Sequence, residues 1–157
     1  MKILIADDHV LFRQGLKQIL AEEFPRVVFG EASNTRELRE CVQRQAWDVV
    51  LLDISMPGRN GLEVLKEIKQ TQPRLPVLVL SMHPEDQFAL RAFKAGAAGY
   101  MTKESAAAAL VKAIQDVIGG GTYISTAFAP RLARQIGGHT DKPNHQSLFL
   151  GTASKDN

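Results

Sequence analysis

The chain has 157 residues, of which 19 are Lys or Arg and 17 are Asp or Glu, giving a formal net charge of +2. This length suits one domain that buries its own core without disulfides or metal, and the near balance of charge gives no electrostatic indication of a nucleic-acid or membrane partner. The single cysteine, Cys41, cannot form an internal disulfide, and the sequence shows neither a signal peptide nor an apolar stretch of membrane-spanning length. We therefore expect a cytoplasmic protein that makes no contact with the membrane.

The first half of the chain alternates short apolar runs with helical patterns. In chain order, the pattern predicts a strand at 2–6, a helix at 10–24, a strand at 27–32, a helix at 34–46, a strand at 48–53 and a helix at 61–70. Asn34 is expected to cap the second helix, because Glu37 follows three positions later as in a capping box. The run from Val49 to Leu52 is apolar at every position, which is typical of a strand covered on both faces.

The same alternation continues in the second half. It predicts a strand at 75–81, a helix at 85–95, a short strand at 98–102 and an Ala-rich helix at 104–118. The glycines at 119–121 stop the last helix. Five strands alternating with five helices imply right-handed crossovers and a parallel sheet. The fold class is therefore α/β, a doubly wound five-stranded parallel sheet with helices on both faces. For this sheet we take the flavodoxin-like strand order 2-1-3-4-5, which is one of the common orders of doubly wound folds.

The chain beyond the last predicted strand and helix has a weaker pattern. We expect residues 1–121 to form the domain and residues 122–136 to form a short linker or helix. Residues 137–157 are polar, contain Gly and Pro and lack periodicity, which indicates a flexible tail. This segment is too short for a second core, so we expect no DNA-binding domain and no specific DNA binding by this chain alone.

Three carboxylates are expected at one edge of the sheet. Asp7 and Asp8 follow the first strand, and Asp53 ends the third, which is its neighbour in the predicted order. Like charges held together repel, so the cluster favours a hard cation with oxygen ligands, and Mg²⁺ is the natural choice. Two simpler interpretations stay open: Asp8 as the cap of the first helix and Asp53 as the cap of the following turn.

A hydroxyl and an ammonium are expected at the same edge. Ser81 ends the fourth strand and Lys103 follows the fifth, and both can contact phosphoryl oxygens. With Mg²⁺ and an acceptor carboxylate they supply the positioning and charge neutralisation that phosphoryl transfer needs. Alone, a serine is more often a cap and a lysine more often a solvated charge. His9 and His83 flank this region without metal-ligand spacing, and we expect both to be exposed or locally hydrogen-bonded.

These motifs together resemble a known family. The Asp7-Asp8 pair, Asp53 followed by "MPGRNGLE", Ser81 and "KAGAAGYMTK" are similar to the receiver domain of bacterial response regulators, over residues 2 to about 121. "FRQGL", "SMHPED" and "GGGTYIS" further resemble the NarL/FixJ (LuxR-type) subfamily, whose receiver precedes a helix-turn-helix domain. Many receivers have a small residue where Met82 stands and a proline where Glu104 stands, but neither departure removes a reacting group.

The resemblance implies a role for each site residue. Asp53 would accept a phosphoryl group from a sensor histidine kinase in a Mg²⁺-dependent reaction. The other roles are Asp8 as a direct metal ligand, Asp7 as a water-mediated one, Ser55 as a ligand through its backbone carbonyl, Lys103 as the partner of Asp53 and of its phosphoryl group, Ser81 as a donor to that group, and Tyr100 as a switch. The protein would thus be a phospho-acceptor, with self-catalysed phosphorylation and dephosphorylation as an option, and not an ordinary enzyme.

The resemblance also implies an output for the domain. In full-length members of the family the switch controls transcription, and phosphorylated receivers of this subfamily pair through their first and fifth helices, where Ala106 to Ala109 would permit close approach. These alanines could equally pack on the sheet.

Two other classes of protein share features with this sequence but require motifs that it lacks. A flavodoxin-like or dinucleotide-binding protein needs a G-x-G-x-x-G loop, and a magnesium phosphohydrolase would have D-x-D after the first strand; the chain has neither there. A stand-alone receiver or a pseudo-receiver that signals by protein contact remains the alternative.

Overall fold

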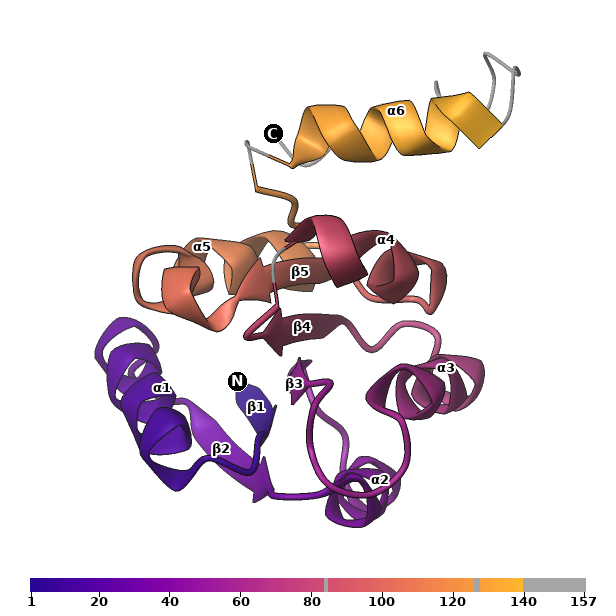
Figure 1. Cartoon of the computed structure of the whole chain (residues 1–157). Coiled ribbons are helices and arrows are strands. Elements are labelled where there is room, and N and C mark those ends of the chain that lie inside the picture. The colour runs from indigo at the N-terminus through magenta and orange to yellow at the C-terminus, as the bar shows by residue number, and fades with distance from the viewer. Residues whose placement is uncertain (84, 126–127, 140–157) are drawn as a thin grey trace.

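A five-stranded parallel sheet forms the centre of the protein. The computed structural model describes residues 1–83, 85–125 and 128–139 (Figure 1). The strands are β1 Lys2–Ala6, β2 Val28–Ala32, β3 Val49–Asp53, β4 Val77–Ser81 and β5 Gly99–Thr102. They pair in parallel in the order β2-β1-β3-β4-β5, so the predicted topology is confirmed.

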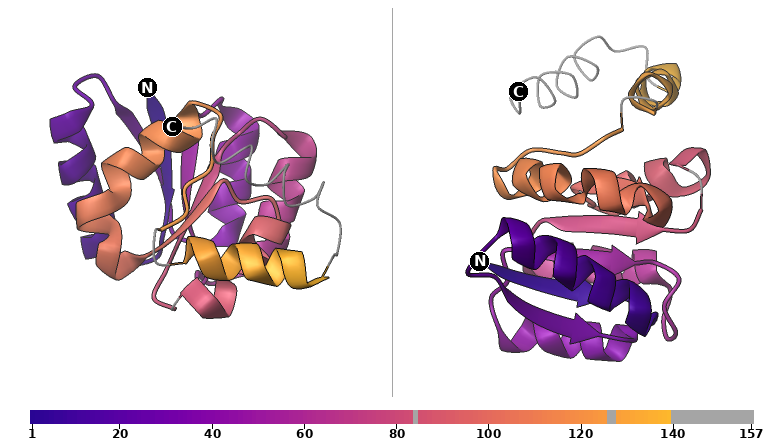
Figure 2. Two further views of the ribbon diagram at one scale, coloured as in Figure 1. Left: turned by 90° about the horizontal axis from the view of Figure 1, so that it is seen from above. Right: turned by 90° about the vertical axis from the view of Figure 1, so that its left-hand side faces the viewer.

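Helices cover both faces of this sheet. They are α1 Val10–Glu23, α2 Thr35–Arg44, α3 Gly61–Thr71, α4 Glu85–Lys94, α5 Ala106–Ile118 and α6 Ala129–His139, with a 3₁₀ turn, η1, at Lys103–Ser105. α1 and α5 lie side by side against one face, and α2, α3 and α4 cover the other (Figures 1 and 2). No helix in the described ranges is both long and apolar enough to cross a bilayer.

The strands divide their side chains between two apolar layers. In β1, Ile3 and Ile5 pack with α1 and α5, while Leu4 and Ala6 pack with the helices of the opposite face. Every residue of β3 and β4 is buried, because helices cover both sides of these central strands. Burial on both faces explains the continuous apolar runs in the sequence. Because the strands are parallel, the last residue of each lies at the same edge of the sheet.

Two helix starts test the capping predictions. In α2 the Asn34 side chain accepts a hydrogen bond from the backbone N–H of Glu37 at 2.8 Å, and the Glu37 carboxylate accepts from the N–H and Oγ of Ser33. The predicted cap at Asn34 is therefore confirmed. The cap position of α1 is His9, which makes no side-chain cap bond. The interpretation of Asp8 as the cap of this helix is wrong, so its carboxylate is available for another role.

The C-terminal part differs from the prediction in its boundaries. Tyr123 forms an isolated parallel bridge with Gly99 of β5, so this part of the expected linker runs along the sheet edge. α6 begins only at Ala129 and extends to His139, which carries helix into the segment expected to be a tail. Phe128 and Leu132 are buried in the apolar layer of the α4 side, and such long-range contacts leave no signal in local periodicity. The remainder of the expected tail, 140–157, lies outside the described residues.

Candidate functional site

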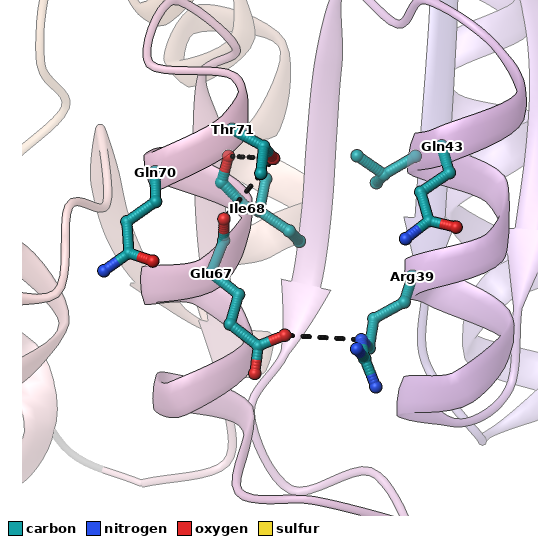
Figure 3. Close-up of a pocket in the computed structure, with 7 residues that line it drawn as sticks. Arg39, Gln43, Glu67, Ile68, Gln70 and Thr71 are labelled. Carbon is teal, nitrogen blue, oxygen red and sulfur yellow. Dashed lines mark hydrogen bonds and ion pairs between the residues drawn. The ribbon is translucent and has the colours of Figure 1, made fainter.

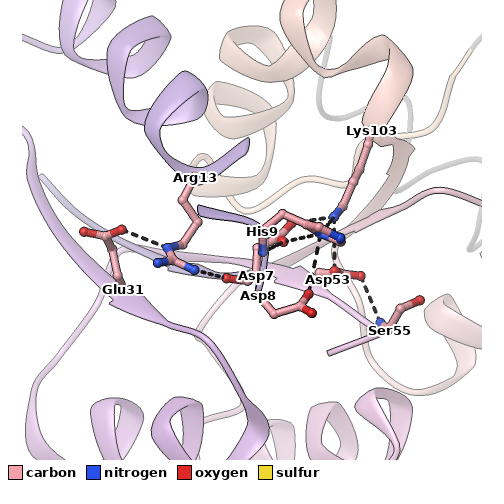
Figure 4. Close-up of polar contacts among 8 residues, drawn as sticks. All are labelled: Asp7, Asp8, His9, Arg13, Glu31, Asp53, Ser55 and Lys103. Carbon is pink, nitrogen blue, oxygen red and sulfur yellow. Dashed lines mark hydrogen bonds and ion pairs between the residues drawn. The ribbon is translucent and has the colours of Figure 1, made fainter. Parts of the chain in front are cut away.

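The charged site residues meet at the carboxyl edge of the sheet, as Figure 4 shows. Asp7 follows β1 directly, Asp53 is the last residue of β3, and Lys103 follows β5. The two aspartates are each 2 % exposed and Lys103 is 9 % exposed. Parallel pairing of neighbouring strands brings their ends together, which places these three groups, far apart in the sequence, in one buried cluster.

Lys103 lies between the two buried carboxylates. Its Nζ is 3.1 Å from Oδ2 of Asp53, to which it donates a hydrogen bond, and 2.7 Å from Oδ2 of Asp7. The second contact brings opposite charges together, but its angles do not make it a hydrogen bond. Buried charges are tolerated only when they are paired, and the one ammonium of Lys103 is the opposite charge that both buried carboxylates face.

The two oxygens of Asp53 have different partners. Oδ1 accepts a hydrogen bond from the backbone N–H of Ser55 at 2.9 Å, and Oδ2 accepts from Lys103. Oδ1 therefore caps the following turn, as one interpretation of the sequence predicted, while Oδ2 faces the lysine of the cluster. The bond to Ser55 fixes the loop after β3, which brings the backbone of that residue beside the cluster (Figure 4).

Ser81 and Tyr100 connect to the loop after β4. Ser81 is fully buried, and its Oγ accepts a hydrogen bond from the backbone N–H of His83 at 3.0 Å. Tyr100 is 1 % exposed, and its hydroxyl donates to the backbone carbonyl of His83 at 3.0 Å. The His83 ring in turn lies 4.6 Å from the Phe88 ring of α4. The hydroxyl and the aromatic residue therefore contact the same residue of one loop, from two different strands.

The acid cluster has the chemistry of a cation site. Among the described residues, two buried side-chain oxygens have no hydrogen-bond partner, Oδ2 of Asp7 and Oδ1 of Asp8. One ligand atom from each of Asp7, Asp8, His9 and Asp53 lies within 4.8 Å of the others. Carboxylate oxygens are the ligands that hard divalent cations prefer, so the three aspartates fit Mg²⁺.

Arg13 supports the cluster from outside and was not predicted from the sequence. Its guanidinium donates to the backbone carbonyl of Asp7 and, at 2.9 Å, to Oε1 of Glu31 on β2. Hydrogen bonds from Arg13 and then Lys17 lower the pKa of Glu31. Arg13 lies one helical turn after His9, at the start of α1. This spacing from His9 is the only feature of the sequence that could have indicated a role for Arg13, because its partner Glu31 on β2 is distant in sequence.

A hollow elsewhere on the surface carries none of these residues. It lies between α2 and α3, where Arg39 and Glu67 form an ion pair at 3.3 Å (Figure 3). Its other lining residues are polar or aliphatic side chains without a titratable cluster, namely Val42, Gln43, Ile68, Gln70 and Thr71. The reactive groups of the described structure are therefore gathered at the strand edge and not in this hollow.

The strand order and the helices on both faces are those of a CheY-like α/β fold. The chain belongs to the response regulator receiver domain family, whose pattern it matches over residues 3–115. A crystal structure of a LuxR-family two-component response regulator from Aurantimonas sp. SI85-9A1 superposes with a TM-score of 0.77 at 34 % identity, covering 85 % of this chain and 96 % of that one.

Two curated relatives extend beyond the region shared with this chain. The response regulator GacA of Pseudomonas aeruginosa is 37 % identical over 157 residues, covering 99 % of this chain and 72 % of GacA. The transcriptional regulatory protein DegU of Brevibacillus brevis is 36 % identical over 151 residues, covering 96 % of this chain and 64 % of DegU. This chain thus spans a little under two thirds of DegU. The predicted resemblance to LuxR-type response regulators is confirmed by the Aurantimonas structure.

Proposed function

We propose that this chain accepts a phosphoryl group on Asp53 from a sensor histidine kinase in a Mg²⁺-dependent reaction. The observation that carries the proposal is the buried Asp53 carboxylate, which faces the Lys103 ammonium beside two further aspartates. An ionised carboxylate needs no general base to attack a phosphoryl group. Its burial at the end of a strand removes competing water and fixes its direction.

The transfer conserves atoms and charge in a simple way. A carboxylate oxygen of Asp53 forms a bond to phosphorus, and the bond from phosphorus to the donor nitrogen of the kinase histidine breaks. The electron pair of that bond leaves with the imidazole, and the product is an aspartyl phosphate. Lys103, already beside Asp53, stabilises the negative charge on the transferred group. Attack of water on the same phosphorus would return the carboxylate and release inorganic phosphate.

Four residues would hold the Mg²⁺ ion. Asp8 and Asp53 bind it directly, Asp7 binds it through a water molecule, and Ser55 contributes its backbone carbonyl. The oxygens of Asp7 and Asp8 that accept no hydrogen bond support this assignment. When bound, the ion neutralises phosphoryl oxygens during transfer. No covalent step requires a further residue of the described chain.

Ser81 and Tyr100 would report the phosphoryl group to the rest of the domain. In this proposal Ser81 donates its hydroxyl to a phosphoryl oxygen, which releases the contact with the N–H of His83. Tyr100 then changes rotamer, because its hydroxyl shares the same loop residue as partner. The loop after β4 is the two-state element that both side chains bias.

The output of the switch is proposed to be control of transcription. DegU is described as a transcriptional regulatory protein, and it is similar to this chain over 151 residues. We place the protein in the cytoplasm, where a histidine kinase can reach it, without membrane contact. Specific DNA binding is not expected of the residues that the structure describes, since they supply no supported recognition helix.

Intact mass measurement tests the acceptor assignment. Wild-type protein incubated with Mg²⁺ and a small phosphodonor should gain the mass of one phosphoryl group, whereas Asp53→Asn should gain none. Asp116→Asn is a matched control, because this partly buried carboxylate on α5 pairs with Lys112 and is not part of the cluster. It should be phosphorylated like the wild type. An adduct that persists in Asp53→Asn or in excess chelator would refute the assignment, and no adduct in any variant would favour a pseudo-receiver.

A further inference from the structure

His9 faces the carboxylate cluster, and it is both exposed and locally hydrogen-bonded, the two states that the sequence suggested. Its side chain is 61 % exposed, but Nδ1 lies 3.0 Å from Oδ1 of Asp7 and 3.5 Å from Oδ1 of Asp8. Figure 4 shows the ring between Asp8 and Lys103. The backbone N–H of His9 also donates to Oδ1 of Asp7 at 2.8 Å, which holds the residue in this position.

Nδ1 is the ring nitrogen that faces the cluster, 3.1 Å from Nζ of Lys103 and 3.0 Å from Oδ1 of Asp7. The tautomer of the ring decides its role: with the hydrogen on Nε2, Nδ1 accepts from the ammonium, and with the hydrogen on Nδ1 it donates to Asp7. In the first tautomer, a cation that takes the place of the ammonium would be bound by the nitrogen and the carboxylate oxygens together.

The spacing of these atoms suits one octahedral ion. Ligands about 2.1 Å from a metal place neighbouring ligand atoms about 3 Å apart and opposite ones about 4.2 Å apart. The contact of Nδ1 with Oδ1 of Asp8, at 3.5 Å, is close to the spacing of neighbouring positions. One ligand atom from each of Asp8, His9 and Asp53 lies within 4.8 Å of the others, so a small contraction would bring these three direct ligands together, while Asp7 stays the water-mediated ligand.

We propose that His9 supplies an imidazole nitrogen as a ligand to the cation, so that this site prefers first-row transition ions such as Mn²⁺ over Mg²⁺. This inference rests on the proposed function, because it concerns the same cation. Mg²⁺ selects oxygen ligands and keeps its waters, whereas imidazole is a ligand of the borderline transition ions. One nitrogen among carboxylates therefore changes which ion binds best, while the oxygen ligands still accept Mg²⁺.

Pulsed electron paramagnetic resonance of the full chain loaded with Mn²⁺ tests the ligand directly. A bound imidazole gives a ¹⁴N coupling to the manganese, which carboxylates and water cannot give. We expect this coupling in the wild type, its loss in His9→Gln, and its retention in His83→Gln. His83 is the matched control, because it is an exposed histidine near the same edge whose ring packs on Phe88. Equal melting temperatures without metal would establish that both variants fold.

Competition between ions tests the selectivity. The molar excess of Mg²⁺ needed to displace bound Mn²⁺ should be about tenfold lower in His9→Gln than in the wild type. Loss of one side chain that supports a metal typically changes the affinity for that metal by about this factor. An unchanged excess, or bound Mn²⁺ without a ¹⁴N coupling in the wild type, would overturn the role of His9 and leave the phospho-acceptor proposal intact. Failure of the wild type to bind either ion would instead overturn the metal-dependent step of the proposed function.

Discussion

At the scale of single residues, the site is organised around one buried ammonium. Lys103 touches Asp7, Asp53 and His9, and the first two are almost fully enclosed. Removal of one partner from such a group leaves uncompensated buried charge, which costs more than the pair itself contributes. The lysine therefore has two roles in our account: it compensates the carboxylates before a cation binds, and it contacts the phosphoryl group afterwards.

Lys103→Met tests the first of these roles. Without divalent cations the substitution should lower the free energy of unfolding by roughly 3 kcal/mol, because the buried carboxylates of Asp7 and Asp53 lose their positive partner. Added Mg²⁺ should stabilise this variant more than the wild type, since the ion no longer competes with an ammonium and binds only the folded state. Urea denaturation with and without Mg²⁺ measures both effects.

The control for that experiment is Lys112→Met. Lys112 is an exposed lysine of α5 whose side chain is 75 % exposed and pairs with Asp116 at 3.3 Å. Surface pairs of this kind contribute at most about 1 kcal/mol, so the change should be small and independent of Mg²⁺. Equal stabilisation of the wild type and Lys103→Met by Mg²⁺ would show that ammonium and cation do not share the carboxylates.

Among the secondary-structure elements, a helix whose first turn is capped by a side chain begins at a position that the local sequence determines. α2 begins where Asn34 accepts the N–H of Glu37, and Glu37 in turn accepts from Ser33. These bonds from Ser33 lower the pKa of Glu37, because they stabilise its charged form. α1 lacks such a cap, because the residue at its cap position, His9, makes no side-chain cap bond.

Asn34→Ala tests the contribution of the cap. It should lower the free energy of unfolding by about 1 kcal/mol, the usual cost of a lost helix cap, without changing cation binding at the distant site. Arg36→Ala in the same helix is the comparison, because it removes only an exposed i,i+4 pair with Glu40 worth about 0.5 kcal/mol or less. Thermal unfolding of the two variants measures the difference. Similar losses in both would mean that the bonds of Asn34 add nothing beyond those of a surface residue.

The elements also show what the sequence could and could not predict. Apolar runs located all five strands, and the alternation with helices predicted a parallel sheet, because parallel α/β units allow few topologies. The strand order taken for that sheet is the order observed. The same logic brought Asp7, Asp53 and Lys103 together at the strand edge. Contacts that depend on the folded chain were missed. The bridge from Tyr123 to Gly99 is one, and the direction of the His9 ring is another.

At the scale of the whole molecule, α1 and α5 form one continuous face (Figure 2). Ala106 is buried against the sheet, as one of the two sequence interpretations required, whereas Ala107 and Ala108 are exposed. The alanines are therefore divided between the core and the surface. We expect the exposed pair to form part of the contact between two phosphorylated copies, since small side chains let helices approach closely.

Ala108→Glu tests this interface. A two-fold contact brings the same patch of both copies together, so each added carboxylate would be buried near its symmetry mate. Phosphorylation-dependent dimerisation should weaken by about tenfold or more, because burying an unpaired charge is costly. Gln43→Glu adds the same charge on the exposed side of α2, beside the hollow of Figure 3, and should dimerise like the wild type. Sedimentation of each protein, with its phosphorylation verified by mass, measures the dimer. A dimer of unchanged strength in Ala108→Glu would place the contact on another face of the domain.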